Sequence, residues 1–371
     1  MPLPRRTLLL GATAGLSTAA LSTARATPAG AATGRLFGPY GTPAARIDSL
    51  TLYVDPGGRG DHRTLQAAVD ASSPAGGGVI VLAAGTYRER VLVPPSRPSL
   101  TLLGASGRAA DTVIVLDTAA GTPKPGGGTY GTTGSATVTF QADGLTAHHL
   151  TFANDWLRAA NPTVTGTQAV AVKVTGDRCA FHHCRFLGHQ DTLYADSANL
   201  SVVARQYFGH CYVEGDVDFV FGRATAVLDH CELRTLERDV AFTPQGFVFA
   251  PSTARANPHG FLAQHCAFTG TAAPGAFRLA RPWVPSSDPT ARPMLTVRRS
   301  RIGAGIHAPA PYTDMSAAYP WQQQRFAEYA NEGPGAAITV PAERPQLARE
   351  QATLHTRETY LTGSDGWTPW A

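Results

Sequence analysis

The sequence predicts an all-β protein folded as a parallel β-helix, and three observations support this fold class. First, short apolar runs such as "GGVIVLAAGTY", "TVTF" and "AVAVKV" are separated by turns, in keeping with 38 glycines and 28 prolines among 371 residues. Second, helical periodicity is scarce. Third, one local motif recurs at irregular intervals, which is typical of a solenoid whose coils carry loops of different length.

The recurring motif places a histidine directly before a small apolar residue. It reads "HHCRF", "GHCYV", "DHCEL" and "QHCAF", and a fifth copy, "HHLTF", has leucine where the others have cysteine. We expect the cysteine, which packs as a small hydrophobe, and the residue two positions later to point inward, with each histidine outside or in a turn. The motif therefore predicts one interior column formed by Leu150, Cys184, Cys211, Cys231 and Cys266.

Both ends of such a solenoid need a cover over the open core. The stretch "TLQAAVDAS" at 64–72 is the only convincing helix, and we expect it to cap the N-terminal end. Near the other end, residues 321–329 are predicted as a loop and residues 342–356 as a helix that packs back on the solenoid. No linker divides residues 48–371, so we predict a single β-helix domain there, preceded by a linker at 27–47.

Residues 1–26 have the features of an export signal. Paired Arg5 and Arg6 precede an apolar stretch and an Ala24-Arg25-Ala26 cleavage site, the pattern of the twin-arginine route. The apolar part is too short to span a bilayer, so we expect no membrane anchor. Removing the three arginines of this segment lowers the formal net charge from +4 to +1 (4 − 3). We therefore expect a secreted protein with no nucleic-acid partner.

The five cysteines indicate neither a disulfide scaffold nor a zinc site. Their number is odd, and none has C-x-x-C spacing. Neighbouring histidine pairs, such as His148–His149 and His182–His183, point to opposite faces of a strand and cannot easily chelate one ion together. We expect mostly free thiols, no metal, no cofactor and a monomer.

Acidic side chains gather in two short stretches. In "VEGDVDFVFG" (213–222), Glu214, Asp216 and Asp218 alternate, which on one strand would place all three carboxylates on the same face. In "GHQDTLYAD", Asp191 lies 27 residues before Asp218, close to one coil. Neighbouring strands of a sheet lie about 4.7–4.9 Å apart, so these two carboxylates are expected side by side.

Glutamines and an arginine fall at matching intervals. Gln168 lies 22 residues before Gln190, which itself precedes Asp191. We therefore expect Gln168, the Gln190–Asp191 pair and Asp218 to stack on three successive rungs. Arg281 follows Asp218 after 63 residues, and its long side chain could reach back to the same place.

With these motifs in order, the chain resembles the pectin methylesterase family over about residues 48–370. The resemblance is carried by Gln168, "QDTLY" at 190–194, "GDVDFVFG" at 215–222 and "RPW" at 281–283. It implies a right-handed parallel β-helix with a surface cleft. It also implies hydrolysis of the methyl esters of polygalacturonate, with methylesterified pectin as substrate and methanol as product.

The resemblance also implies residue roles. Asp218 would be the nucleophile and Asp191 the general acid/base, while Gln168 and Gln190 would form the oxyanion hole and Arg281 would orient Asp218. The chemistry fits, because Arg281 favours the ionised form of Asp218 and two adjacent carboxyl groups resist double ionisation, which leaves the proton on Asp191.

The sugar-contacting residues implied by the resemblance are mostly aromatic, as suits the apolar faces of sugar rings. They are Trp283, Tyr194 and Phe221, with Val217 and Met315 beside them. One departure concerns His189, since family members more often carry an aromatic residue there.

Other functions remain open at this point. The same machinery would serve an esterase or thioesterase acting on another substrate. Two carboxylates about 5 Å apart would also suit a retaining glycosidase, and a lyase would need a calcium site of several acids. A non-catalytic polysaccharide-binding β-helix would not need the five polar residues together. Strand geometry alone does not exclude Asp216 as the nucleophile.

Overall fold

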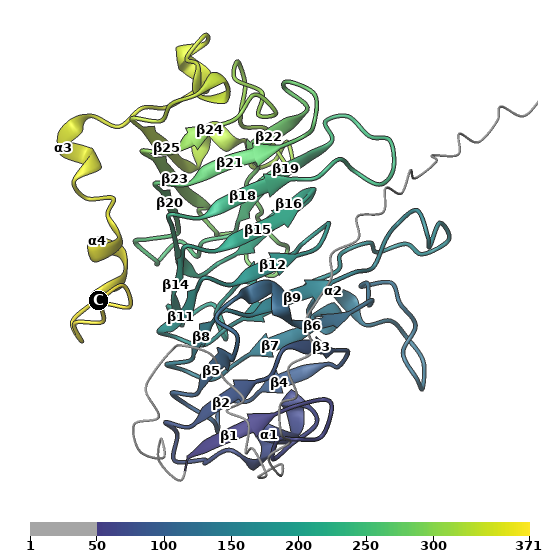
Figure 1. Cartoon of the computed structure of the whole chain (residues 1–371). Coiled ribbons are helices and arrows are strands. Elements are labelled where there is room, and N and C mark those ends of the chain that lie inside the picture. Colours follow the sequence, from purple (N-terminus) through teal and green to yellow (C-terminus); the bar gives the residue numbers. More distant parts are fainter. Residues whose placement is uncertain (1–49) are drawn as a thin grey trace, which may run out of the picture. The chain divides into compact units, whose positions relative to one another are not determined.

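The computed structural model describes residues 50–371, and in this range the chain forms a parallel β-helix made of three sheets (Figure 1). The predicted fold class is therefore confirmed. The predicted export signal at 1–26 and the linker at 27–47 lie outside the described residues.

Each sheet consists of strands from successive coils, paired in parallel. The ten-stranded sheet contains β1 (Thr51–Val54), β2 (Val79–Leu82), β5 (Thr101–Gly104), β8 (Thr146–His148), β11 (Cys179–His182), β14 (Arg205–Gly209), β17 (Thr225–Asp229), β20 (Phe261–Gln264), β23 (Met294–Arg298) and β25 (Arg325–Tyr329). The eight-stranded sheet contains β3 (Gly85–Tyr87), β6 (Thr112–Leu116), β9 (Thr151–Asn154), β12 (Arg185–Leu187), β15 (Tyr212–Gly215), β18 (Glu232–Thr235), β21 (Ala267–Gly270) and β24 (Arg301–Ile302).

The third sheet has seven strands and carries the site described below. Its strands are β4 (Val91–Val93), β7 (Val138–Phe140), β10 (Val172–Val174), β13 (Leu193–Ala195), β16 (Val217–Gly222), β19 (Gly246–Pro251) and β22 (Phe277–Ala280). A typical coil contributes one strand to each sheet in turn, as β14, β15 and β16 do before β17 returns to the ten-stranded sheet. Residues that are one coil apart in sequence are consequently neighbours in space.

The predicted interior column is present. Leu150 and the four cysteines of the motif are each at most 2% exposed and directly precede paired strands of the eight-stranded sheet. The residues two positions later are buried as well, among them Phe152, Phe186 and Phe268. Burying a phenylalanine side chain contributes roughly 1.5–3 kcal/mol to stability, so the repeat builds the core. All five cysteines are free, as expected.

Helix α1 (Leu65–Ala71) caps the N-terminal end of the described β-helix, as predicted. Thr64 ends the preceding extended segment, and its side chain accepts a hydrogen bond from the backbone N–H of Ala67. Helix α1 lies beside the first strands (Figure 1). Its apolar face, which contains Leu65, Ala68 and Val69, is buried in the core.

The C-terminal region differs from the prediction in two respects. Residues 321–329 are not simply a loop, because β25 (Arg325–Tyr329) extends the ten-stranded sheet after the short 3-10 helix η2 (Trp321–Gln323). Glu328 points inward on this strand and is compensated by Arg344, whose Nη2 lies 2.7 Å from Oε2. A buried ion pair can therefore take the place of an apolar residue that the sequence pattern would require.

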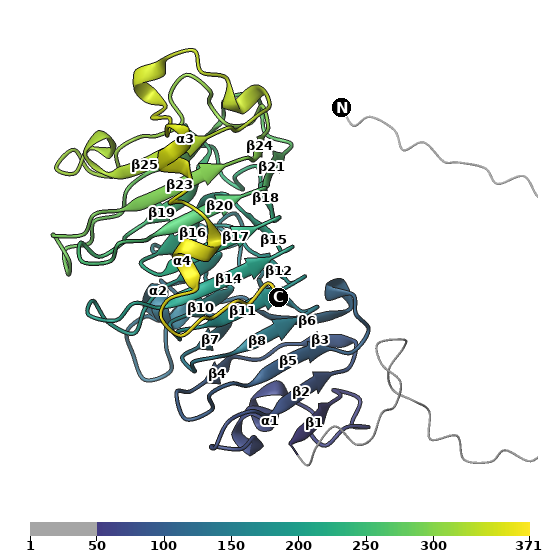
Figure 2. The same ribbon diagram turned by 90° about the vertical axis from the view of Figure 1, so that its left-hand side faces the viewer.

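The predicted helix at 342–356 is much shorter in the structure. It is reduced to α3 (Arg349–Ala352), because the residues before it are extended and pair with β25: Glu328 donates to the carbonyl oxygen of Pro345 and accepts from the N–H of Leu347. Helix α4 (Arg357–Leu361) then packs against β14 and β17 (Figure 2). The remaining short helices are α2 (Gly131–Ser135), η1 (Ala109–Asp111), η3 (Pro334–Ala336) and η4 (Pro341–Glu343). Within residues 50–371, no helix combines the length and apolarity needed to cross a membrane.

Candidate active site

A cleft of about 440 Å³ lies over the seven-stranded sheet and is lined by all five residues that the sequence predicts to be catalytic: Gln168, Gln190, Asp191, Asp218 and Arg281. The glutamines and aspartates come from three successive coils, and Arg281 comes from two coils further on. Gln168 precedes β10, Gln190 and Asp191 precede β13, Asp218 lies on β16, and Arg281 follows β22.

The two aspartates occupy adjacent rungs. Leu193 pairs with Val220, and Asp191 and Asp218 each lie two residues before these partners. The backbone N–H of Asp191 donates to the carbonyl oxygen of Val217 at 2.9 Å, which holds the two segments together. Both aspartates have left-handed backbone conformations, with φ of 66° and 50°. Non-glycine residues rarely adopt this conformation, and it is found preferentially at functional sites.

The prediction that Glu214, Asp216 and Asp218 share one strand face is wrong. The stretch contains two strands, β15 and β16, which belong to different sheets and meet at a corner at Asp216. Glu214 accepts a hydrogen bond from the hydroxyl of Tyr212 at 2.6 Å, and Asp216 is fully buried. Only Asp218 of the three lines the cleft. The strand alternation also breaks after Asp218, since Phe219 and Val220 are both buried in the core.

Arg281 binds Asp218 with two parallel hydrogen bonds. Its Nε donates to Oδ1 at 2.9 Å and its Nη2 to Oδ2 at 2.6 Å. The guanidinium is also packed over the ring of Phe247, 3.9 Å from the centroid, which fixes its plane. Burial raises the pKa of Asp218, and the hydrogen bonds from Arg281 oppose this rise by stabilising the carboxylate.

Asp191 has no comparable cationic partner at hydrogen-bond distance among the described contacts of its side chain. Burial, reinforced by the nearby charge of Asp218, raises the pKa of Asp191 well above its ordinary value. The attraction of Arg281 and Arg158 is weaker than these two effects. The pair is thus arranged to share one proton, with the carboxylate on Asp218 and the proton on Asp191.

A buried network fixes the side chain of Gln190. Its Oε1 accepts from the hydroxyl of Thr167 at 2.6 Å and from Nη2 of Arg158 at 3.3 Å. Arg158 is itself held by Asp216, whose two oxygens lie 2.7 and 2.9 Å from its nitrogens. Because the side-chain oxygen of Gln190 already accepts these two hydrogen bonds, its amide N–H groups are the part that can donate to a substrate in the cleft. Sequence reasoning missed Thr167 and Arg158, and it left Asp216 open as a catalytic residue.

An aromatic wall forms one side of the cleft. The rings of Tyr194 and Phe221 stack at 4.1 Å, and Trp283 approaches them at 6.3 and 5.8 Å. Met315 packs against the same cluster. These four predicted contact residues line the cleft. Val217, the first residue of β16, does not belong to the lining.

The structure adds Arg223 to the cleft lining, together with Thr132, Ala250 and Ser287. Arg223 directly follows the "GDVDFVFG" motif, and its Nε lies 2.6 Å from Oδ1 of Asp196. Lys173 bonds the other oxygen of Asp196 at 3.3 Å and covers the ring of Tyr194. Two cations thus share one buried acid beside the aromatic wall, which leaves net positive charge at this end of the cleft.

Comparisons with known proteins agree on one family. The family model for pectinesterase matches residues 51–364. A pectinesterase of Ralstonia solanacearum is 34% identical over 311 residues, covering 75% of this chain and 78% of the relative. Pectinesterase A of Dickeya chrysanthemi is 33% identical over 341 residues, covering 83% of this chain and 89% of the relative.

Solved structures give the same result. A pectin methylesterase from Erwinia chrysanthemi superimposes with a TM-score of 0.76 at 28% identity, covering 88% of this chain and 99% of the other. A pectin methylesterase determined in complex with a hexasaccharide has a TM-score of 0.75 at 30% identity, covering 86% of this chain and 98% of the other.

Proposed function

The chain belongs to the pectinesterase family and is a carboxylic ester hydrolase that demethylates pectin, and we propose that Asp218 and Asp191 carry out this hydrolysis in two steps. The observation that carries the assignment is the pairing of an arginine-bound aspartate with a second, uncompensated aspartate on the adjacent rung.

In the first step, a carboxylate oxygen of Asp218 attacks the carbonyl carbon of the methyl ester. The amide N–H groups of Gln168 and Gln190 stabilise the oxyanion that forms. When the tetrahedral intermediate collapses, the bond to the methoxy oxygen breaks and that oxygen takes the proton of Asp191. Methanol leaves, and the sugar carboxyl is joined to Asp218 as an anhydride.

In the second step, the carboxylate of Asp191 takes a proton from water, and the resulting hydroxide attacks the acyl carbon. The bond to Asp218 breaks, which restores its carboxylate and leaves the proton on Asp191. The product departs as a carboxylic acid and ionises in solvent, so each turnover releases one methanol and one proton. Arg281 keeps Asp218 both aimed and ionised before attack and after release.

The cleft suits a chain of sugars with acidic groups. Tyr194, Phe221 and Trp283 offer flat apolar surfaces to sugar rings. Arg223 supplies a positive charge near free galacturonate carboxylates, which the enzyme itself generates. We propose methylesterified polygalacturonate as the occupant of this cleft.

Methanol release from methylated pectin by the purified chain tests this function. We expect equal amounts of methanol and titratable acid, with no new reducing ends and no unsaturated sugars. Reducing ends without methanol would indicate a glycosidase, and unsaturated products would indicate a lyase. If neither methanol nor any of these products forms, while pectin still binds, the chain is a binding protein.

We propose that residues 1–26 direct export by the twin-arginine route and that residues 27–47 are a linker to the enzyme domain. Pectin is a polymer outside the cell that makes it, so its hydrolysis requires a secreted enzyme. Replacing both Arg5 and Arg6 by lysine should retain the protein inside a bacterial host, as measured by immunoblot of the cell fraction and the medium. Unchanged secretion of the double variant would point to another route.

A further inference from the structure

The histidines of the recurring motif form a row that the ester hydrolysis does not use. Each of the five directly follows a strand of the ten-stranded sheet and has φ between 52° and 55°. Their rings stack from coil to coil with centroids 4.8–5.2 Å apart. The row contains His149, His183, His210, His230 and His265.

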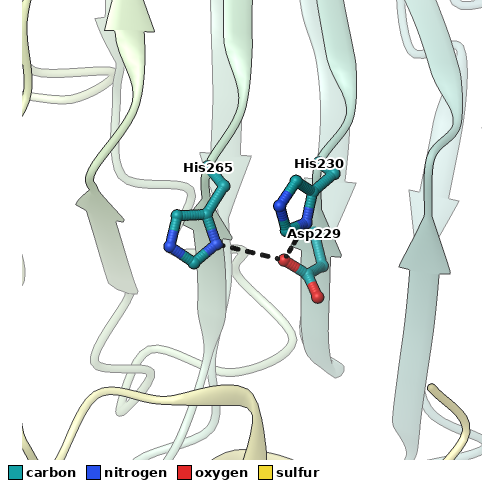
Figure 3. Close-up of side chains that lie close together, drawn as sticks. All are labelled: Asp229, His230 and His265. Carbon is teal, nitrogen blue, oxygen red and sulfur yellow. Dashed lines mark hydrogen bonds and ion pairs between the residues drawn. The ribbon is translucent and has the colours of Figure 1, made fainter. Parts of the chain in front are cut away.

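The stacking changes at the C-terminal end of this histidine row. The planes of His149 and His183 differ by only 11°, whereas those of His230 and His265 differ by 33°. These last two rings turn toward Asp229, as Figure 3 shows. Nδ1 of His230 lies 2.9 Å from Oδ1 of Asp229, and Nδ1 of His265 lies 3.4 Å from the same oxygen. His230 is the only histidine of the row that follows an acidic residue, since the other four follow His148, His182, Gly209 and Gln264.

The side chains of Asp229, His230 and His265 have the spacing of a metal-binding set. Their ligand atoms all lie within 4.8 Å of one another. A tetrahedral ion with ligands at about 2.0–2.2 Å holds them roughly 3.3 Å apart, close to the two distances observed here. The side chains of His230 and His265 are 49% and 35% exposed, so an ion can enter from solvent and a water molecule can complete its coordination.

Neighbouring groups hold the carboxylate in position for such an ion. Oδ2 of Asp229 accepts from Nη1 of Arg357 at 2.7 Å and from the hydroxyl of Tyr207 at 3.2 Å, which leaves Oδ1 toward the imidazoles. Gln264 donates to Oδ1 at 3.1 Å. Arg357 is also bonded to Glu358, at 2.9 Å, so part of its charge is offset. Outer contacts of this kind orient the ligands in metal sites.

We propose that Asp229, His230 and His265 bind one divalent transition-metal ion of the zinc class. Two imidazoles and one carboxylate suit Zn²⁺, Co²⁺ or Ni²⁺, whereas Ca²⁺ and Mg²⁺ prefer oxygen ligands alone. The ion ties two adjacent coils together and, through Asp229 and Arg357, joins them to α4. From the sequence we expected no metal, because no cysteines have C-x-x-C spacing and neighbouring histidines point to opposite faces of a strand. The set proposed here instead combines Asp229 and His230 with His265 from the adjacent coil.

A second group of similar composition provides a contrast. His189, Asp216 and Asp239 also bring their ligand atoms within 4.8 Å of one another. There, however, Nη1 of Arg158 lies 2.7 Å from Asp216 and 2.6 Å from Asp239, so a guanidinium already provides the positive charge between the carboxylates. At Asp229 the guanidinium of Arg357 binds Oδ2 instead, and Oδ1, which also accepts from Gln264, faces the two imidazoles.

Metal titration of the whole chain, without a histidine tag and after treatment with a chelator, tests the proposal. We expect one Co²⁺ per chain, with the visible absorption of a four-coordinate site, and displacement of Co²⁺ by Zn²⁺. His230→Gln and His265→Gln should each weaken Co²⁺ affinity by at least about tenfold, since each removes one of three protein ligands. His183→Gln, in the same row but without a neighbouring carboxylate, is the matched control and should bind as the unaltered chain does.

The proposal is overturned if the unaltered chain binds no Co²⁺ saturably, or if His183→Gln weakens binding as much as His265→Gln. It is also overturned if neither ligand variant changes the affinity. Methanol release monitors folding, because none of these residues lies in the cleft, and it should be equal in all four proteins. Zn²⁺ should also raise the midpoint of thermal unfolding of the unaltered chain but not that of His230→Gln. This second measurement decides the matter if His265→Gln fails to fold.

Discussion

Replacing Asp218 by alanine is expected to abolish methanol release, by at least about 10⁴-fold, because no covalent bond to the sugar carboxyl can then form. The loss should be the same for methylated pectin and for an activated aryl ester of galacturonate, since a better leaving group cannot compensate for a missing nucleophile. Asp218→Asn should be equally inactive. This substitution preserves the shape of the side chain beside Arg281. An inactive but folded Asp218→Asn protein would therefore show that activity is lost because the nucleophile is missing and not because the packing has changed.

Glu214→Gln provides the matched control for Asp218. Glu214 lies in the same ten-residue stretch but on β15, where it bonds Tyr212 outside the cleft. We expect its substitution to leave methanol release within about twofold of the unaltered chain, as for surface changes away from a site. Activity that survives in Asp218→Ala, or a covalent sugar adduct that maps to Asp216, would refute the assignment of the nucleophile.

The stacking of the two aspartates could be predicted from the sequence because a solenoid converts spacing into proximity. Asp218 follows Asp191 by 27 positions, which is one coil, and parallel pairing then brings the two side chains onto adjacent rungs. The interior cysteine column follows from the same rule. In both cases, residues that recur once per coil in the sequence are stacked in space. Their positions in the sequence are therefore enough to predict which side chains are neighbours.

The buried network around Gln190 could not be predicted in this way. Arg158 comes from an irregular segment outside the sheets and bonds Asp239, which lies 81 residues later in the chain. No sequence periodicity relates such positions. The corner at Asp216 could not be predicted either. Alternating residues indicate a strand but not the point at which the chain turns from one sheet to the next.

Replacing Asp191 by alanine should slow methanol release from pectin by roughly 10²–10⁴-fold, the usual cost of losing a general acid. Unlike Asp218→Ala, this variant keeps its nucleophile, so an activated aryl ester should restore the first step. Deacylation still lacks its base, and the acyl adduct should therefore accumulate on Asp218. Mass spectrometry of the protein after an acid quench locates that adduct. Rescue by the aryl ester in Asp218→Ala, or an adduct on Asp191 in the unaltered chain, would reverse the two roles.

The pH dependence gives the same assignment an independent check. The unaltered chain needs Asp218 ionised and Asp191 protonated, so methanol release should fall as the pH drops through the pKa of Asp218 and as it rises through that of Asp191. Burial raises both pKa values, and that of Asp191 further, which leaves a window of activity between them. In Asp191→Ala the acylation rate with the aryl ester should keep its acid limb and lose its alkaline limb, because the group whose deprotonation causes the alkaline loss is gone. An alkaline limb that persists unchanged in this variant would mean that another group supplies the proton to methanol.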